Sequence, residues 1–254
     1  MPLASPELKA IIDKYSPFLI EARKRVFFTL FVFAASTLVG FVFYERIIKF
    51  LIDLLGLTGI NLVFTSPFQY INLAIACGAT TGLILSFPLL VAQVLFFLKP
   101  ALREKEYKTV VGFLPFSLVL FLIGFAFGAF IMKWQIELFL AKSVSLGIGN
   151  ILDISRLLTT VLLTSVFLGI GFQFPIVLLL LMRLGIIKRQ QLAGGRKWVY
   201  LGSFLFAILL PADSILADVL LSLPLIILFE VTLIINRIFE RKKNTSPNEE
   251  INKH

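Results

Sequence analysis

The sequence predicts an all-α, polytopic membrane protein whose six transmembrane helices form a concave bundle. Hydrophobic residues occupy 58% of its 254 positions, 27 of them Phe, and the mean hydropathy is +0.95. These values lie well outside the range of water-soluble domains. Apolar runs long enough to cross a bilayer recur along the chain, and basic residues gather between alternate runs.

Six apolar runs are the predicted spans, because a helix rises about 1.5 Å per residue and the hydrocarbon core is about 30 Å thick. They are residues 26–44, 71–98, 110–132, 157–182, 198–210 and 215–235 of a single transmembrane domain, 1–243. The fifth run is short and is followed by a turn at Pro211, so the last two helices are expected to thin the bilayer or form a deep hairpin. Residues 244–254 are expected to be a disordered cytoplasmic tail.

The basic residues predict the orientation of these spans. All but five of the 24 Lys and Arg lie before the first run, between the second and third, between the fourth and fifth, or after the sixth. The exceptions are Arg46, Lys49, Lys133, Lys142 and Arg156. Since cytoplasmic loops carry the Lys and Arg excess, both termini are expected in the cytoplasm. The net charge of +9 therefore does not call for a nucleic acid partner.

The chain offers few groups for catalysis. Cys77 is its single cysteine and His254 its single histidine, and no nucleotide-binding motif is present. We therefore expect no enzyme activity, no metal and no cofactor. The main alternative function is a small-solute secondary transporter. Such a protein needs a polar site near the bilayer midplane, where this chain has only Gln173 and Glu230.

Polar residues within or beside the spans are the candidate functional positions. The amide of Gln173 could bond to a partner helix, or it could stabilise the bend that Pro175 introduces into the fourth span. Asp213 and Asp218 lie at the outer end of the last helix pair. They could bind a cation, although capping or solvating a helix start is the favoured interpretation.

Two carboxylates stand among the cytoplasmic basic residues, Glu21 before the first span and Glu106 between the second and third. Such acids usually neutralise their neighbours. If the two converge at one rim, however, they could bind a pair of guanidinium groups through charge-assisted, bidentate hydrogen bonds.

Two patterns concern packing. Residues 45–57 predict a short amphipathic helix, which either lies at the membrane interface or packs on the bundle. The pairs Gly78/Gly82 and Gly124/Gly128 have the GxxxG spacing that lets neighbouring helix backbones approach closely.

Several segments, distributed over nearly the whole chain, match a known family. They are Leu19-Ile20-Glu21-Ala22-Arg23-Lys24-Arg25, Ser66-Pro67-Phe68, Phe87-Pro88 with Gln93-Val94, Phe97-Leu98-Lys99-Pro100-Ala101-Leu102 with Glu106, Gly171-Phe172-Gln173-Phe174-Pro175, and Ser222-Leu223-Pro224 with Leu228-Phe229-Glu230. On these segments the chain resembles the TatC family, the receptor and core subunit of the twin-arginine protein translocase. There are three departures. Gln173 stands where the family often has Glu, the acid at Asp213 is shifted, and Ala22 replaces the usual Leu.

The resemblance implies a function. The chain would bind the twin-arginine signal peptides of folded precursor proteins, self-associate, and organise single-span TatA-type and TatB-type partners for export driven by the proton-motive force. It would lie in the bacterial cytoplasmic membrane, or in the thylakoid membrane if organelle-encoded. The implied signal-peptide residues are Glu21, Arg23, Phe97 and Glu106, and the implied partner-helix contacts are Gln173, Pro175, Asp213 and Asp218.

Overall fold

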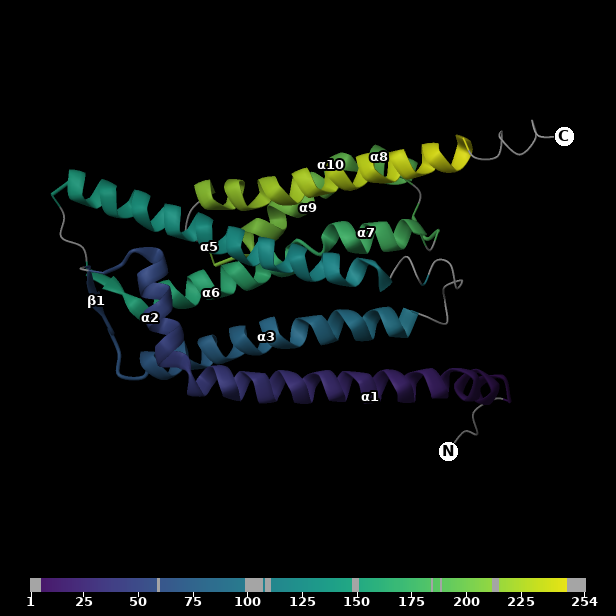
Figure 1. Ribbon diagram of the computed structural model, residues 1–254, viewed down its shortest axis with the longest axis horizontal. Helices are drawn as coiled ribbons and strands as arrows, with labels where there is room; N and C mark the ends of the chain where they lie inside the picture. Colours follow the sequence, from purple (N-terminus) through teal and green to yellow (C-terminus); the bar gives the residue numbers. More distant parts are fainter. Residues whose placement is uncertain are drawn as a thin grey trace.

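Long apolar helices dominate the computed structural model, which describes residues 6–58, 60–98, 107, 111–147, 151–183, 185–187, 189–211 and 215–245. In chain order the elements are α1 (Pro6–Val42), α2 (Tyr44–Leu55), β1 (Asn61–Val63), α3 (Gln69–Leu98), α5 (Phe113–Ser145), β2 (Ile151–Asp153), α6 (Ile154–Gly171), α7 (Phe174–Arg183), α8 (Arg189–Gly194), α9 (Arg196–Ile208) and α10 (Ile215–Thr245). The start of α1 and the end of α10 lie at one end of the bundle, here called the termini end (Figure 1). At the opposite end, the strand end, lie α2, β1 and β2 (Figure 1).

Five helical segments within the described residues are long and apolar enough to cross a membrane. They are Ile20–Val42, Gln69–Phe97, Leu114–Ser145, Ile154–Met182 and Ile215–Arg237. The chain is therefore a multi-pass membrane protein. With 13 residues, α9 is about 20 Å long, so a sixth crossing stays a prediction.

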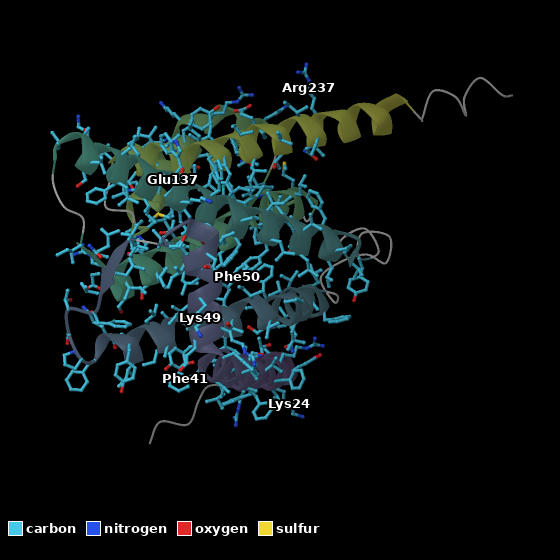
Figure 2. The ribbon with its side chains drawn as sticks, turned by 60° about the vertical axis from the view of Figure 1, so that its left-hand side comes forward. Lys24, Phe41, Lys49, Phe50, Glu137 and Arg237 are labelled. Carbon is cyan, nitrogen blue, oxygen red and sulfur yellow. The ribbon has the colours of Figure 1, made fainter. Side chains whose placement is uncertain are left out.

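The helices follow one another across the bundle from α1 at one edge to α10 at the other, with α3, α5 and α6 between them (Figure 1). Lys24 on α1 and Arg237 on α10 point away from the bundle at these two edges (Figure 2). Buried residues form one cluster at the strand end around Leu73 and Leu158, a second around Leu168 and Leu221, and a third around Phe229. No described side chain of α1 belongs to any of these clusters.

Glycine provides the closest approaches between helices, as its spacing predicts. A Cβ atom on Gly82 of α3 would lie 3.0 Å from the carbonyl oxygen of Phe33, and one on Gly78 would lie 2.9 Å from that of Thr37, both on α1. The pair on α5 faces α6 in the same way, because a Cβ on Gly128 would lie 2.7 Å from Ser165 Cα. Both GxxxG pairs therefore mark helix contacts within this chain.

The strand end is held by a short strand pair and a polar network. β1 and β2 are parallel, with Leu62 opposite Leu152. Asp153, the residue before α6, accepts hydrogen bonds from Thr65 Oγ1 at 2.6 Å, Gln69 Nε2 at 2.7 Å and the Arg156 amide at 3.0 Å. Burial acts to raise the pKa of Asp153, but these hydrogen bonds outweigh it and lower the pKa below its ordinary value.

The structure differs from the predicted elements at several places. The third predicted span ends at Met132, but α5 continues to Ser145, because Lys133 and Glu137 interrupt the apolar run without ending the helix. The all-α prediction lacks β1 and β2, whose three-residue pairing depends on a contact between distant segments. Helix α10 extends to Thr245, so residues 244 and 245 are helical, while 246–254 lie outside the described residues.

The predicted fourth span is broken into α6 and α7 just before Pro175. Pro175 is the second residue of α7, a position where its missing N–H costs no hydrogen bond. Gln173 lies in the break and bonds to α5. Its Oε1 accepts from Ser117 Oγ at 2.5 Å, and its Nε2 donates to the carbonyl oxygen of Ser117 at 3.2 Å and to that of Gly169 at 3.4 Å. The amide thus joins the break and the end of α6 to α5.

Replacing Gly82 with Ala should lower the melting temperature of the detergent-purified protein by several degrees, because the new Cβ overpacks the α1–α3 contact at a cost of about 1–3 kcal/mol. The matched control is Gly202→Ala on α9, where an added Cβ meets nothing within 4 Å. Equal melting temperatures for the two variants would contradict the proposed role of the glycine contact.

Replacing Gln173 with Leu should destabilise the fold by roughly 1–2 kcal/mol, because Ser117 loses both its acceptor and its donor. Thermal unfolding of Gln173→Leu, Ser117→Ala and the double variant measures this. If the pair acts as one unit, the double variant is less destabilised than the sum of the single variants. Strict additivity would show that the two residues act independently.

Candidate functional site

A groove of about 550 Å³ lies between α1 and α3 in the half of the bundle nearer the termini end. Its walls are mostly apolar, with Val26, Leu30 and Phe33 on α1 facing Leu90, Val94 and Phe97 on α3. Several of these side chains are half-exposed, so the groove is open along its length. A groove of this kind can bind an extended or helical apolar segment of another chain.

The groove begins where the glycine contacts end. Gly82 holds the backbones of α1 and α3 together, and no glycine follows it in α3. From Leu83 onward, side chains of both helices line the groove instead. The groove is therefore a direct consequence of where α3 has its small residues.

Glu21 and Arg25 form an ion pair at the mouth of the groove. Arg25 Nη2 lies 2.6 Å and its Nε 3.2 Å from Glu21 Oε1. The Arg25 guanidinium also lies 5.8 Å from the centre of the Phe96 ring. The Arg25 side chain is 30% exposed and lines the groove, whereas Glu21 is 59% exposed. Glu21 thus presents to solvent a carboxylate that already binds a guanidinium group.

The predicted signal-peptide residues fall into three groups. Glu21 is at the groove mouth and Phe97 is in the groove wall. The guanidinium of Arg23 instead lies 5.7 Å from the Phe27 ring, and Arg23 is not part of the wall. Glu106 lies outside the described residues, so its predicted meeting with Glu21 stays a prediction.

The sequence reasoning missed two residues of the groove. The first is Arg25, whose i, i+4 spacing from Glu21 is the signal that could have identified it. The second is Gln93, which lines the groove and whose Oε1 is buried without a hydrogen-bond partner among the described residues. A buried, unpaired acceptor costs about 1–3 kcal/mol, so a bound donor would relieve it.

The predicted partner-contact residues are dispersed. Pro175 is buried, and the Gln173 amide is bonded to α5. Asp218 lies in the first turn of α10, where its Oδ1 is buried without a partner among the described residues. Asp213 lies outside the described residues. Contact between any of these positions and a partner helix stays a prediction.

The two polar residues that a midplane transport site would need are engaged within the chain. Gln173 is bonded to α5, and Glu230 Oε1 accepts a hydrogen bond of 2.6 Å from Tyr200 Oη. The Nε atom of Arg196 lies 3.5 Å from the same oxygen, so Glu230 joins α9 to α10. Among the described residues, no three His, Cys, Asp or Glu side chains gather in a group that could hold a metal ion.

Comparison with known proteins places the chain in one family. Residues 17–224 match the family model described as Sec-independent protein translocase protein (TatC). The TatCy protein of Bacillus subtilis is 29% identical over 232 residues, covering 89% of each chain. The TatC protein of Aquifex aeolicus is 28% identical, covering 88% of this chain and 94% of its own.

The fold agrees with this assignment. A crystal structure described as the twin arginine translocase receptor TatC in the detergent DDM superposes with a TM-score of 0.77 at 26% identity. The superposition covers 86% of this chain and 98% of that structure. The chain therefore belongs to the TatC family of Sec-independent protein translocase proteins.

Proposed function

We propose that this chain is the receptor subunit of a twin-arginine translocase and that it binds signal peptides in the groove between α1 and α3. The groove itself carries the proposal. It combines a long apolar wall with a carboxylate at one end, Glu21. A signal peptide has the complementary arrangement, two arginines followed by an apolar segment.

The Glu21–Arg25 pair supports the chemistry of arginine recognition. Arg25 bonds to Oε1 of Glu21 through two of its nitrogens. A planar guanidinium can also bond to both carboxylate oxygens in parallel, which a lysine ammonium cannot reproduce. A signal-peptide arginine would take the place of Arg25, or would bind Oε2, which has no partner among the described residues. The neighbouring Phe96 ring would remain as a stacking surface for either guanidinium.

Gln93 and Glu106 would complete the site. The buried Oε1 of Gln93 would accept a hydrogen bond from the peptide, which would remove an unpaired acceptor from the groove wall. From the family resemblance, Glu106 would supply the second carboxylate for the second arginine, and Arg23 would shape the same region. The two acids would together favour two adjacent positive charges over one.

We further propose an orientation with both termini in the cytoplasm and six spans in a concave bundle. The uneven distribution of Lys and Arg supports this orientation, as does the placement of the first turn of α1 and the last turn of α10 at one end (Figure 1). The groove mouth would then face the cytoplasm, where precursor proteins are made. The membrane would be the bacterial cytoplasmic membrane.

The proposal also includes partner subunits that associate with this chain in the membrane. TatA-type and TatB-type single-span helices would pack near Gln173 and Pro175 and along α9 and α10, and copies of this chain would associate with one another. Asp218 Oδ1, which is buried without a partner among the described residues, supports this location, because a polar group of a partner helix could bond to it. Transport would draw on the proton-motive force. Family membership favours this function over small-solute transport.

The proposal is tested by crosslinking a twin-arginine signal peptide to membranes that contain the Glu21→Gln variant. Loss of a charge-assisted hydrogen bond should reduce capture about tenfold or more. The matched control is Glu137→Gln, which removes an exposed acid from α5. Glu106→Gln should behave like Glu21→Gln. Unchanged capture by Glu21→Gln, or equal capture of a twin-lysine peptide by the unaltered protein, would contradict the proposed site.

A further inference from the structure

A second cavity, of about 610 Å³, lies at the strand end between α5 and the start of α6. Its deeper wall is apolar and includes Met132 and Ile136, while Lys142, Arg156 and the neighbouring Leu157 lie at its outward end. Lys142 follows Met132 by ten residues of helix, which is about 15 Å. The cavity therefore has a basic end and an apolar end, separated by roughly the length of a short acyl segment.

The charges at this cavity are unusual for their position. Most Lys and Arg lie on the predicted cytoplasmic side, and Lys142 and Arg156 are two of the five basic residues that do not. Asp153 also lines the cavity, but its carboxylate already accepts three hydrogen bonds, from Thr65, Gln69 and the Arg156 amide. The two cations together exceed this one acid, so the outward end attracts an anion.

One further observation points to a lipid rather than to a water-soluble anion. Leu138 and Phe139 line the cavity and are 47% and 55% exposed, so its apolar part opens to the side of the bundle, where lipid chains lie. The wall also contains Gln135, whose Oε1 atom is buried without a hydrogen-bond partner among the described residues.

We propose that this cavity binds one anionic phospholipid. Its phosphate would lie at Lys142 and Arg156, and one acyl chain would run along Met132, Ile136 and Leu157. The bound lipid would fill the gap between α5 and the first turns of α6, next to the network around Asp153 that holds the strand end together. The proposal is independent of signal-peptide binding, because the groove and this cavity share no wall residue.

The test uses the full chain, delipidated in a neutral detergent and titrated with phosphatidylglycerol or with phosphatidylcholine of the same acyl chains. Native mass spectrometry counts the bound lipids. The unaltered protein should bind its first phosphatidylglycerol at least about tenfold more tightly than phosphatidylcholine, since each basic residue near an anionic group contributes favourably. The Lys142→Gln/Arg156→Gln variant should lose this preference.

The matched control is Arg46→Gln/Lys49→Gln, which removes two basic residues from α2, where Lys49 and Phe50 face outward (Figure 2). This control should keep the preference. The single Lys142→Gln change, at an exposed residue, should give an intermediate loss and leaves the fold least disturbed. An unchanged preference in the double variant, an equal loss in the control, or equal binding of both lipids by the unaltered protein would overturn the proposal.

Discussion

The close approach of α1 and α3 at Gly78 and Gly82 is the contact on which the proposed receptor site depends. Within a bilayer, apolar side chains gain little by leaving lipid for another helix, so α1 must be held by close packing instead. Only 6% of the residues in the apolar stretch of α1 are buried, and no described side chain of α1 belongs to the buried clusters. Glycine lets the two backbones meet at one point and separate beyond it. The groove is the space that this separation leaves.

The ion pair between Glu21 and Arg25 affects both the affinity and the selectivity of peptide binding. Because Arg25 already occupies Glu21, an incoming arginine exchanges one guanidinium for another, and the net gain is smaller than that of a new ion pair. Discrimination against lysine survives this exchange, because a planar guanidinium can bond to both carboxylate oxygens at once and an ammonium group cannot. The resident pair thus favours selectivity over tight binding, which suits a receptor that must release its substrate. Affinity would come mainly from the apolar segment of the peptide.

Local patterns in the sequence predict much of this fold. The five apolar segments and both GxxxG contacts follow from hydropathy and residue size, and the break before Pro175 follows from the geometry of proline. The end of α5 was harder to predict, because Lys133 and Glu137 interrupt the apolar run without ending the helix. The pairing of β1 with β2 depends on contacts between residues 90 positions apart, such as Leu62 and Leu152, which no local pattern reports.

The candidate site, like the fold, was predictable only in part. The family resemblance identified Glu21 and Phe97, which the structure places at the mouth and in the wall of one groove. It did not identify Gln93 as an unpaired acceptor, since satisfaction of a polar atom depends on neighbours in three dimensions. Nor did hydropathy distinguish Gln135, because a single amide barely alters the mean of an apolar helix.

The most direct test of the account is to place a photo-crosslinking amino acid at Val94, in the groove, and separately at Val119 on α5. These two positions are 48% and 52% exposed, so they are equally accessible to a membrane-inserted helix. With a twin-arginine signal peptide, the account predicts crosslinks between Val94 and the peptide's apolar segment, and few or none from Val119. Equal crosslinking from both positions, or crosslinking from Val119 alone, would show that the peptide binds elsewhere.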